Sequence, residues 1–125
     1  MQKIVLITGA SRGIGRATAI KFLKEGYKVY GTYNESEQKI DELIKQYGQN
    51  MIKIGPYNFK KIEDIYKLIE DIAGIEFDTL VLNAGTFSEN DDFVNFDLNT
   101  FNEVMNCNFY SQLIIATKLQ SYNSW

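Results

Sequence analysis

Short apolar runs alternate along this chain with longer segments in which apolar residues recur at helical spacing. Runs of this kind predict strands near residues 3–8, 28–33, 51–55 and 78–82, and the longer segments predict helices near 13–25, 36–47, 61–73 and 98–119. Strands that alternate with helices are typical of βαβ units and a mostly parallel sheet. We therefore expect an α/β fold.

Two of the predicted helices have one apolar face each. The helix near 36–47 places Ile40, Leu43, Ile44 and Tyr47 at i, i+3, i+4 and i+7. The helix near 61–73 groups Ile62, Ile65, Tyr66, Ile69, Ile72 and Ala73. We expect both helices to lie with these faces on the sheet.

The composition of the strands suggests their order. Residues 4–7 and 80–82 are continuously apolar, as in strands covered on both faces, whereas residues 51–55 alternate and suit an outer position. With right-handed crossovers these features predict the order 3-2-1-4. The fourth strand would then be an open, apolar edge, and we expect another chain to associate there, most simply as a homo-oligomer.

Composition narrows the classes of function. With 125 residues the chain is predicted to be a single domain, residues 1–125. A net charge of −3 argues against nucleic acid as a partner, no apolar run is long enough to span a membrane, and the first residues lack a signal peptide, so we expect a cytoplasmic protein. Because histidine is absent and Cys107 is the single cysteine, Ser-His-Asp and Cys-His catalysis are excluded, no metal site is predicted, and Cys107 is interpreted as a packing residue.

The segment Thr8–Gly15, with the sequence TGASRGIG, follows the first apolar run and opens the first predicted helix. A helix N-terminus offers unpaired N–H groups and a positive dipole end, and glycines allow a pyrophosphate to approach the backbone closely. Gly9, Gly13 and Gly15 therefore suggest a dinucleotide site. A tight turn without a ligand could use the same glycines, so the loop alone leaves both interpretations open.

Two further motifs favour the first interpretation. The sequence NAG closes the fourth predicted strand, and Asn108 lies within the next helix. Together with the glycine loop they resemble the classical branch of the short-chain dehydrogenase/reductase family, over residues 1 to about 119, with Leu82 where the family often has a first Asn. The resemblance implies a Rossmann-like doubly wound parallel sheet, incomplete in this chain. It also implies that the cofactor phosphates and adenosine contact Gly9, Ser11, Arg12, Gly13, Ile14 and Gly15, and that Asn83, Ala84 and Gly85 form the turn beside the nicotinamide-side ribose.

Asn108 also stands out from its own position. It shares a helical face with Phe101, Val104 and Met105, which predicts a buried amide that must be hydrogen-bonded. An Asn satisfied by its local backbone is the alternative on this pattern. The resemblance implies instead a catalytic Asn that holds a water of the proton relay.

The end of the second strand bears on the choice of cofactor, because an acidic residue there accepts the ribose hydroxyls of NAD. Tyr33 stands where NAD-preferring members of the family carry Asp, and Arg12 matches the basic position of NADP-preferring members. NADP is therefore predicted in preference to NAD, with Tyr33, Asn34 and Ser36 as candidate phosphate or ribose contacts. Asn58 stands where the family commonly has an Asp that binds adenine.

By the same resemblance, catalysis requires a Tyr, a Lys four residues later and a Ser, all beyond the Asn-bearing helix. The sequence ends at Trp125 before such residues, and the tail 120–125 departs from the family pattern, so we expect a shortened form. The one Tyr-x-x-x-Lys, Tyr57 to Lys61, follows the third strand at the adenine side, which is the wrong place for a general acid.

Three hypotheses follow. The chain is an NADP-dependent carbonyl reductase or alcohol dehydrogenase for a small substrate, completed by further residues or by a partner. Alternatively, it is a non-catalytic dinucleotide-binding or interaction protein, which the missing Tyr and Lys favour. The third is a shortened gene product without a selected function.

Overall fold

The computed structural model describes residues 1–87 and 94–120. Its four strands form one parallel sheet in the order β3-β2-β1-β4, which confirms the predicted order and the α/β class. The strands are β1 (Ile4–Thr8), β2 (Lys28–Thr32), β3 (Met51–Ile54) and β4 (Thr79–Leu82). In the centre of the sheet, Leu6 is aligned with Tyr30 on one side and with Leu80 on the other.

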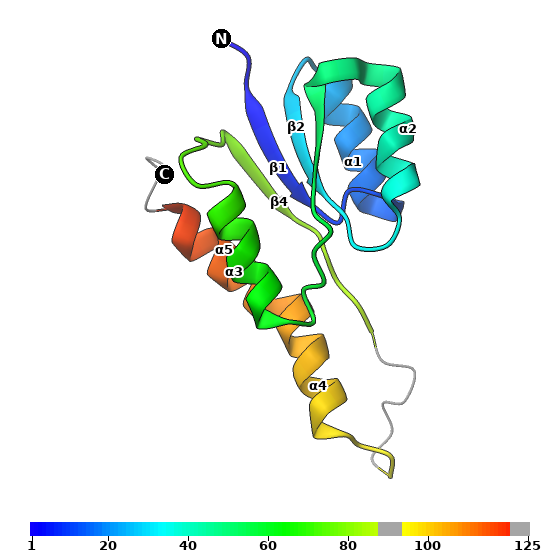
Figure 1. Ribbon diagram of the computed structural model, residues 1–125, viewed down its shortest axis with the longest axis vertical. Helices are drawn as coiled ribbons and strands as arrows, with labels where there is room; N and C mark the ends of the chain where they lie inside the picture. The colour runs from blue at the N-terminus through cyan, green and yellow to red at the C-terminus, as the bar shows by residue number, and fades with distance from the viewer. Residues whose placement is uncertain (88–93, 121–125) are drawn as a thin grey trace.

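Helices cover both faces of this sheet (Figure 1). One face carries α1 (Gly13–Lys24) and α2 (Glu37–Tyr47), and the other carries α3 (Ile62–Asp71) and α5 (Ser111–Gln120). Because side chains alternate along a strand, Val5 and Ile7 pack into the core under α1 and α2, whereas Leu6 packs into the core under α3 and α5. Strand β1 is thus buried on both faces, as its continuous apolar run predicts.

Two details differ from the expected pattern. All four residues of β4 are only half-buried, because an edge strand has a neighbour on one side only. In α3, Tyr66 is exposed and Leu68 is buried, so the core-facing stripe includes Leu68 and excludes Tyr66. A 3₁₀ turn, Gly48–Asn50, separates α2 from β3.

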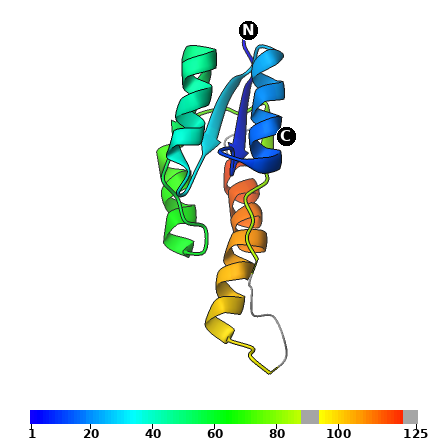
Figure 2. The same cartoon turned by 90° about the vertical axis from the view of Figure 1, so that its right-hand side faces the viewer.

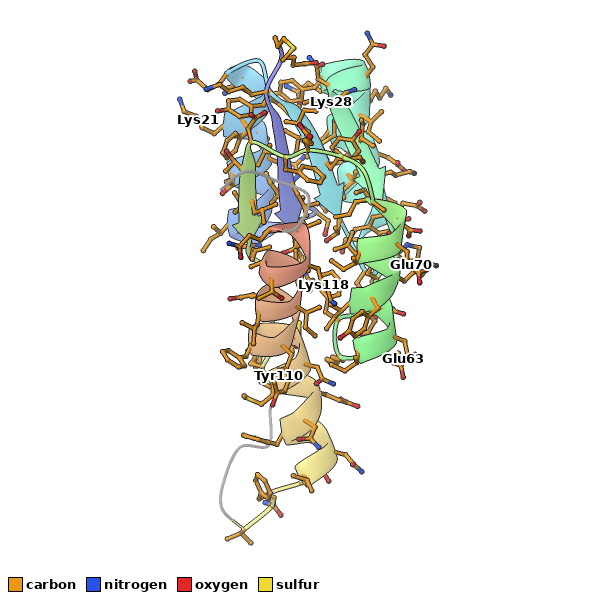
Figure 3. All side chains as sticks on the ribbon, turned by 90° about the vertical axis from the view of Figure 1, so that its left-hand side faces the viewer. Lys21, Lys28, Glu63, Glu70, Tyr110 and Lys118 are labelled. Atoms are coloured by element: carbon orange, nitrogen blue, oxygen red, sulfur yellow. The ribbon has the colours of Figure 1, made fainter. Side chains whose placement is uncertain are left out.

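The segment predicted as one helix over 98–119 is divided into three. Helix α4 (Leu98–Met105) is followed by a π-helical segment (Asn106–Tyr110) and then by α5. Helix α4 extends beyond the ends of the strands, where no layer of the sheet lies against it (Figure 2), and the segment around Tyr110 already lies past them (Figure 3). Large apolar side chains are consequently exposed here: Leu98, Phe101, Phe109, Tyr110 and Leu113.

Within residues 1–87 and 94–120, no helix combines the length and apolar character needed to cross a membrane. Of the tail 120–125, whose sequence departs from the expected pattern, residues 121–125 lie outside the described residues.

Candidate functional site

The carboxyl ends of β1, β2 and β4 meet beside the N-terminus of α1, and a cleft of about 430 Å³ opens there. In open parallel sheets, ligands bind at this edge, where chain connections leave in opposite directions. The cleft is lined by Gly9, Ser11, Arg12, Gly13, Thr32, Tyr33, Asn34, Glu35, Ser36, Tyr57, Asn58, Phe59, Lys60, Asn83, Ala84, Gly85, Thr86 and Cys107. Eleven of the predicted site residues are therefore brought together; Ile14, Gly15 and Asn108 are not in the lining.

Two buried threonine hydroxyls fix the loops of the cleft. The Oγ1 of Thr32 accepts the N–H of Gly9 at 3.0 Å. The Oγ1 of Thr8 accepts the N–H groups of Asn83 and Ala84 at 3.0 and 3.1 Å. Neither threonine was predicted as a site residue; the available signal was a hydroxyl residue at the end of each of these two strands.

Gly13 and Gly15 are needed in the loop for different structural reasons. Gly13 has φ of 60° and open space around its missing Cβ, so bare backbone faces the cleft there. A Cβ on Gly15 would lie 1.9 Å from the carbonyl oxygen of Gly9 and 2.6 Å from Nδ2 of Asn83, so Gly15 serves the packing of α1 against the loop. The Asn83 amide also donates to the Gly9 carbonyl at 3.1 Å. Ile14, in the first turn of α1, points largely into solvent, with 77% of its surface exposed.

Arg12 is the residue immediately before α1, and its side chain is exposed at the cleft. Asn34 and Ser36 also line the cleft, and the exposed carboxylate of Glu35 lies between them in the sequence. The cleft thus presents one guanidinium together with one carboxylate, a charge that the sequence analysis did not place there.

Tyr33 lines the cleft but is nearly buried, with 7% exposed. Its hydroxyl donates to Oε2 of Glu37 at 2.9 Å, and burial together with this bond raises the pKa of the phenol. Because the hydroxyl proton is donated to Glu37, this hydroxyl cannot also donate to a phosphate, but its oxygen can still accept from a ribose hydroxyl.

Lys53, on β3, bonds two carboxylates of α2 close to Tyr33. Its Nζ donates to Oε2 of Glu37 at 3.1 Å and to Oδ1 of Asp41 at 2.7 Å. The bond from Lys53, followed by that from Tyr33, lowers the pKa of Glu37. The network ties α2 to β3 and to the end of β2.

The turn that follows β3 supplies another wall of the cleft, where the resemblance implies a contact to adenine. The Oδ1 of Asn58 accepts the N–H of Lys60 at 3.1 Å, and the Asn58 N–H donates to Oδ2 of Asp64 at 2.7 Å. Since the amide oxygen serves the turn, the amide NH₂ group is the part of Asn58 that suits a base.

Tyr57 is buried, and its hydroxyl donates to a carboxylate oxygen of Asp71. Burial is the main cause that raises the pKa of this phenol, and Asp71 raises it further. A general acid of the expected kind needs a lowered pKa. The observed environment therefore agrees with the expectation that Tyr57 and Lys61 are not a catalytic pair.

Asn108 is exposed, so the expectation of a buried amide was wrong. The apolar neighbours on its face, such as Phe101 with 48% exposed, lie where the helix extends beyond the sheet and meet no core. The amide is nevertheless satisfied: the Thr86 N–H donates to Oδ1, and Nδ2 donates to the Thr86 carbonyl, both at 2.7 Å. Thr86 is 22 residues away, so the alternative of a local backbone partner is also excluded.

Cys107 forms part of the cleft wall as well as part of the core, with 7% of its surface exposed. Burial raises the pKa of its thiol. Other lining residues that the sequence analysis did not select are Glu35, Phe59, Lys60 and Thr86. Among residues 1–87 and 94–120, no group of three His, Cys, Asp or Glu side chains could hold a metal ion.

Comparison with known proteins matches residues 3–122 to the family model described as short chain dehydrogenase. The 3-oxoacyl-(acyl-carrier-protein) reductase FabG of Staphylococcus epidermidis is 37% identical over 95 residues, which is 72% of this chain and 38% of that protein. Among solved structures, ElxO with NADPH bound shares 30% identity with a TM-score of 0.78, over 98% of this chain and 50% of that one. A short-chain dehydrogenase/reductase from Burkholderia multivorans with bound NADP shares 28% identity with a TM-score of 0.81, over 99% and 55%.

The chain spans less than half the length of the curated relatives it matches and about half the length of the solved ones. The family match nevertheless extends from β1 through α5, so it includes the glycine loop, the NAG turn and Asn108. The chain therefore belongs to the short-chain dehydrogenase family.

Proposed function

We propose that this chain binds NADP(H) in the cleft and forms the nucleotide-binding part of an NADP-dependent carbonyl reductase or alcohol dehydrogenase. The observation that carries the proposal is the glycine loop at the start of α1, held by Thr8, Thr32 and Asn83 beside an exposed Arg12. Relatives crystallised with NADPH or NADP support the choice of nucleotide.

The residues present fit a dinucleotide. Around Gly13 the cleft has room for a phosphate against bare backbone, and the N-terminus of α1 favours negative charge. Arg12 would pair with the 2′-phosphate that distinguishes NADP from NAD. Asn34 and Ser36 would contact the ribose, and Asn58 would offer its amide NH₂ to adenine.

At the other end of the cleft, Asn83, Ala84 and Gly85 would border the nicotinamide-side ribose. Bound NADPH supplies a hydride for a carbonyl carbon. Asn108 is the proposed catalytic Asn, and its two bonds to Thr86 fix the loop that follows the NAG turn. We propose that proton transfer to the substrate needs the family's Ser, Tyr and Lys. Tyr57 does not suit this role, because the pKa of its phenol is raised and a general acid of this kind needs a lowered one.

A non-catalytic dinucleotide-binding protein is the second candidate. The bond from Tyr57 to Asp71 favours it, since it occupies the hydroxyl of the sequence's one Tyr-x-x-x-Lys. Turnover of a ketone or alcohol by the purified 125-residue chain would contradict the proposed need for the family's Ser, Tyr and Lys and would overturn the second candidate. NADPH binding without turnover is expected under both candidates.

The test of the nucleotide site is a fluorescence titration with NADPH and with NADH. Arg12→Ala is expected to weaken NADPH binding about tenfold and NADH binding by about twofold or less, because one charge-assisted contact to phosphate is removed. Arg16→Ala is the matched control, since Arg16 lies in α1 four residues after Arg12, outside the cleft lining, and pairs with Glu42. Absence of binding at millimolar NADPH would refute the proposal, and equal losses for both nucleotides would refute the preference for NADP.

We also infer that copies of this chain associate. Exposed apolar side chains along α4 and α5, together with the half-buried edge strand β4, support this inference. The cytoplasmic location stays a prediction.

A further inference from the structure

The π-helical segment Asn106–Tyr110 lies between the two ends of the cleft. Residues two apart on a helix point in nearly opposite directions, because each residue advances the helix by about 100°. Asn106 and Asn108 accordingly reach different walls, while Cys107 between them lines the cleft itself. Single π-turns of this kind are frequent at functional sites.

On one side, Nδ2 of Asn106 donates to the carbonyl oxygen of Lys60 at 2.9 Å, across 46 residues of sequence. The N–H of Lys60 donates to Oδ1 of Asn58, and the N–H of Lys61 donates to the Asn58 carbonyl at 2.9 Å. The Lys60 peptide is therefore held from both ends, by Asn58 within the turn and by Asn106 from a separate helix.

On the other side, Asn108 makes the two bonds to Thr86 in the loop that follows β4. Thr86, Asn58 and Lys60 all line the cleft. One short helical segment thus sets the distance between the wall assigned to adenine and the wall assigned to nicotinamide.

We propose that Asn106 is a positioning residue for the adenine end of the cofactor. It fixes the turn 58–61, and with it the Asn58 amide and the Lys60 side chain, relative to the rest of the cleft. Among the described residues, the other hydrogen bonds of Asn58 and Lys60 reach no farther along the chain than Asp64, so the Asn106 bond is the one hydrogen bond that connects Asn58 or Lys60 to another layer of the fold. This inference rests on the proposed binding of NADP(H).

The test replaces Asn106 by leucine, which is close in size and uncharged and which cannot donate to the Lys60 carbonyl. Asn102→Leu is the matched control, because Asn102 lies about one turn earlier, exposed on α4 and outside the cleft lining. The first readout, amide hydrogen exchange of the nucleotide-free chain, should show faster exchange at residues 59–61 in Asn106→Leu alone.

The second readout is the affinity for two halves of the cofactor, measured by saturation-transfer NMR. Adenosine 2′,5′-bisphosphate should bind about fivefold more weakly to Asn106→Leu, as expected for one lost hydrogen bond that ordered the site, while nicotinamide mononucleotide changes by less than about twofold. A general loss of stability would weaken both halves alike.

Unchanged exchange at residues 59–61, or equal effects on the two halves, would overturn the inference and leave the proposed function standing. Failure of the unsubstituted chain to bind NADPH would instead overturn the proposed function, and it would be seen before any variant is compared.

Discussion

At the scale of single residues, the shape of the cleft depends on a glycine that lacks a Cβ as well as on the side chains that form hydrogen bonds around it. Gly15 leaves the space that the Gly9 carbonyl occupies, and the Asn83 amide closes the same contact from the β4 side. Thr8 and Thr32 then fix the backbone on either side of the loop. The shape of the cleft, the proposed nucleotide site, is thus set by close backbone packing as well as by side chains.

Gly15→Ala is expected to destabilise the chain by about 2 kcal/mol or more, because its Cβ would force α1 away from the loop. NADPH affinity should fall with it. Gly13→Ala is the comparison: its Cβ meets nothing within 4 Å, so only the strain of positive φ, about 1 kcal/mol, is expected. Urea unfolding measures both changes, and a Gly15→Ala variant as stable as the unsubstituted chain would contradict the packing argument.

Cys107 offers a chemical probe of the cleft. Since burial raises the pKa of its thiol above the ordinary value of 9.0, the thiol stays protonated at neutral pH and should react slowly with iodoacetamide. The rate should rise as the pH approaches that raised pKa, and saturating NADPH should slow it further because Cys107 lines the cleft. Mass spectrometry measures the alkylation. Fast alkylation of Cys107 at neutral pH would show that its thiol is not protected by burial.

At the scale of elements, α2 is held to the sheet by charge as well as by its apolar face. Lys53 and Tyr33 lower the pKa of Glu37 below its ordinary 4.5, so the carboxylate stabilises the fold at pH values above 4.5. This contribution is lost as the pH falls through the lowered pKa. The pKa of Asp97, at the N-terminus of α4, is also lowered, because the Thr100 hydroxyl donates to its carboxylate.

Glu37→Gln should therefore reduce the melting temperature at about pH 6, and this effect should shrink as the pH falls through the lowered pKa of Glu37. Glu70→Gln, an exposed substitution on α3, is the control for loss of one negative charge. Thermal unfolding, monitored by circular dichroism over a series of falling pH values, gives the comparison. A difference that did not shrink as the pH fell would show that the Glu37 charge is not what stabilises α2.

Elements also show what sequence could predict and what it could not. The continuous run at residues 4–7 and the alternation at 51–55 correctly placed a central and an outer strand, whereas the equally continuous run at 80–82 belongs to a half-buried edge strand. Asn108 was misjudged because helical spacing identifies a shared face but does not say whether a core lies opposite that face. The bonds of Asn106 and Thr8 join segments 46 to 76 residues apart, and no local pattern encodes them.

At the scale of the whole molecule, the chain is a covered sheet from which α4 extends without support (Figure 2). Leu98, Phe101, Phe109 and Leu113 are all exposed on this helix and its continuation, and gathered exposed apolar side chains are typical of interaction surfaces. Burying these side chains against another copy would remove that surface from water, at roughly 25 cal/mol per Å². Association is thus the expected state at micromolar concentration or above.

Sedimentation equilibrium should give a mass above 14.4 kDa that falls on dilution. Leu113→Glu is expected to weaken association about tenfold or more, because a carboxylate would have to lose its water on burial. Gln46→Glu adds the same charge at an exposed position of α2 and should leave the mass unchanged. NADPH binding should survive both substitutions, since neither residue lines the cleft. A single 14.4 kDa species at every concentration would show that the exposed side chains of α4 and α5 do not mediate self-association.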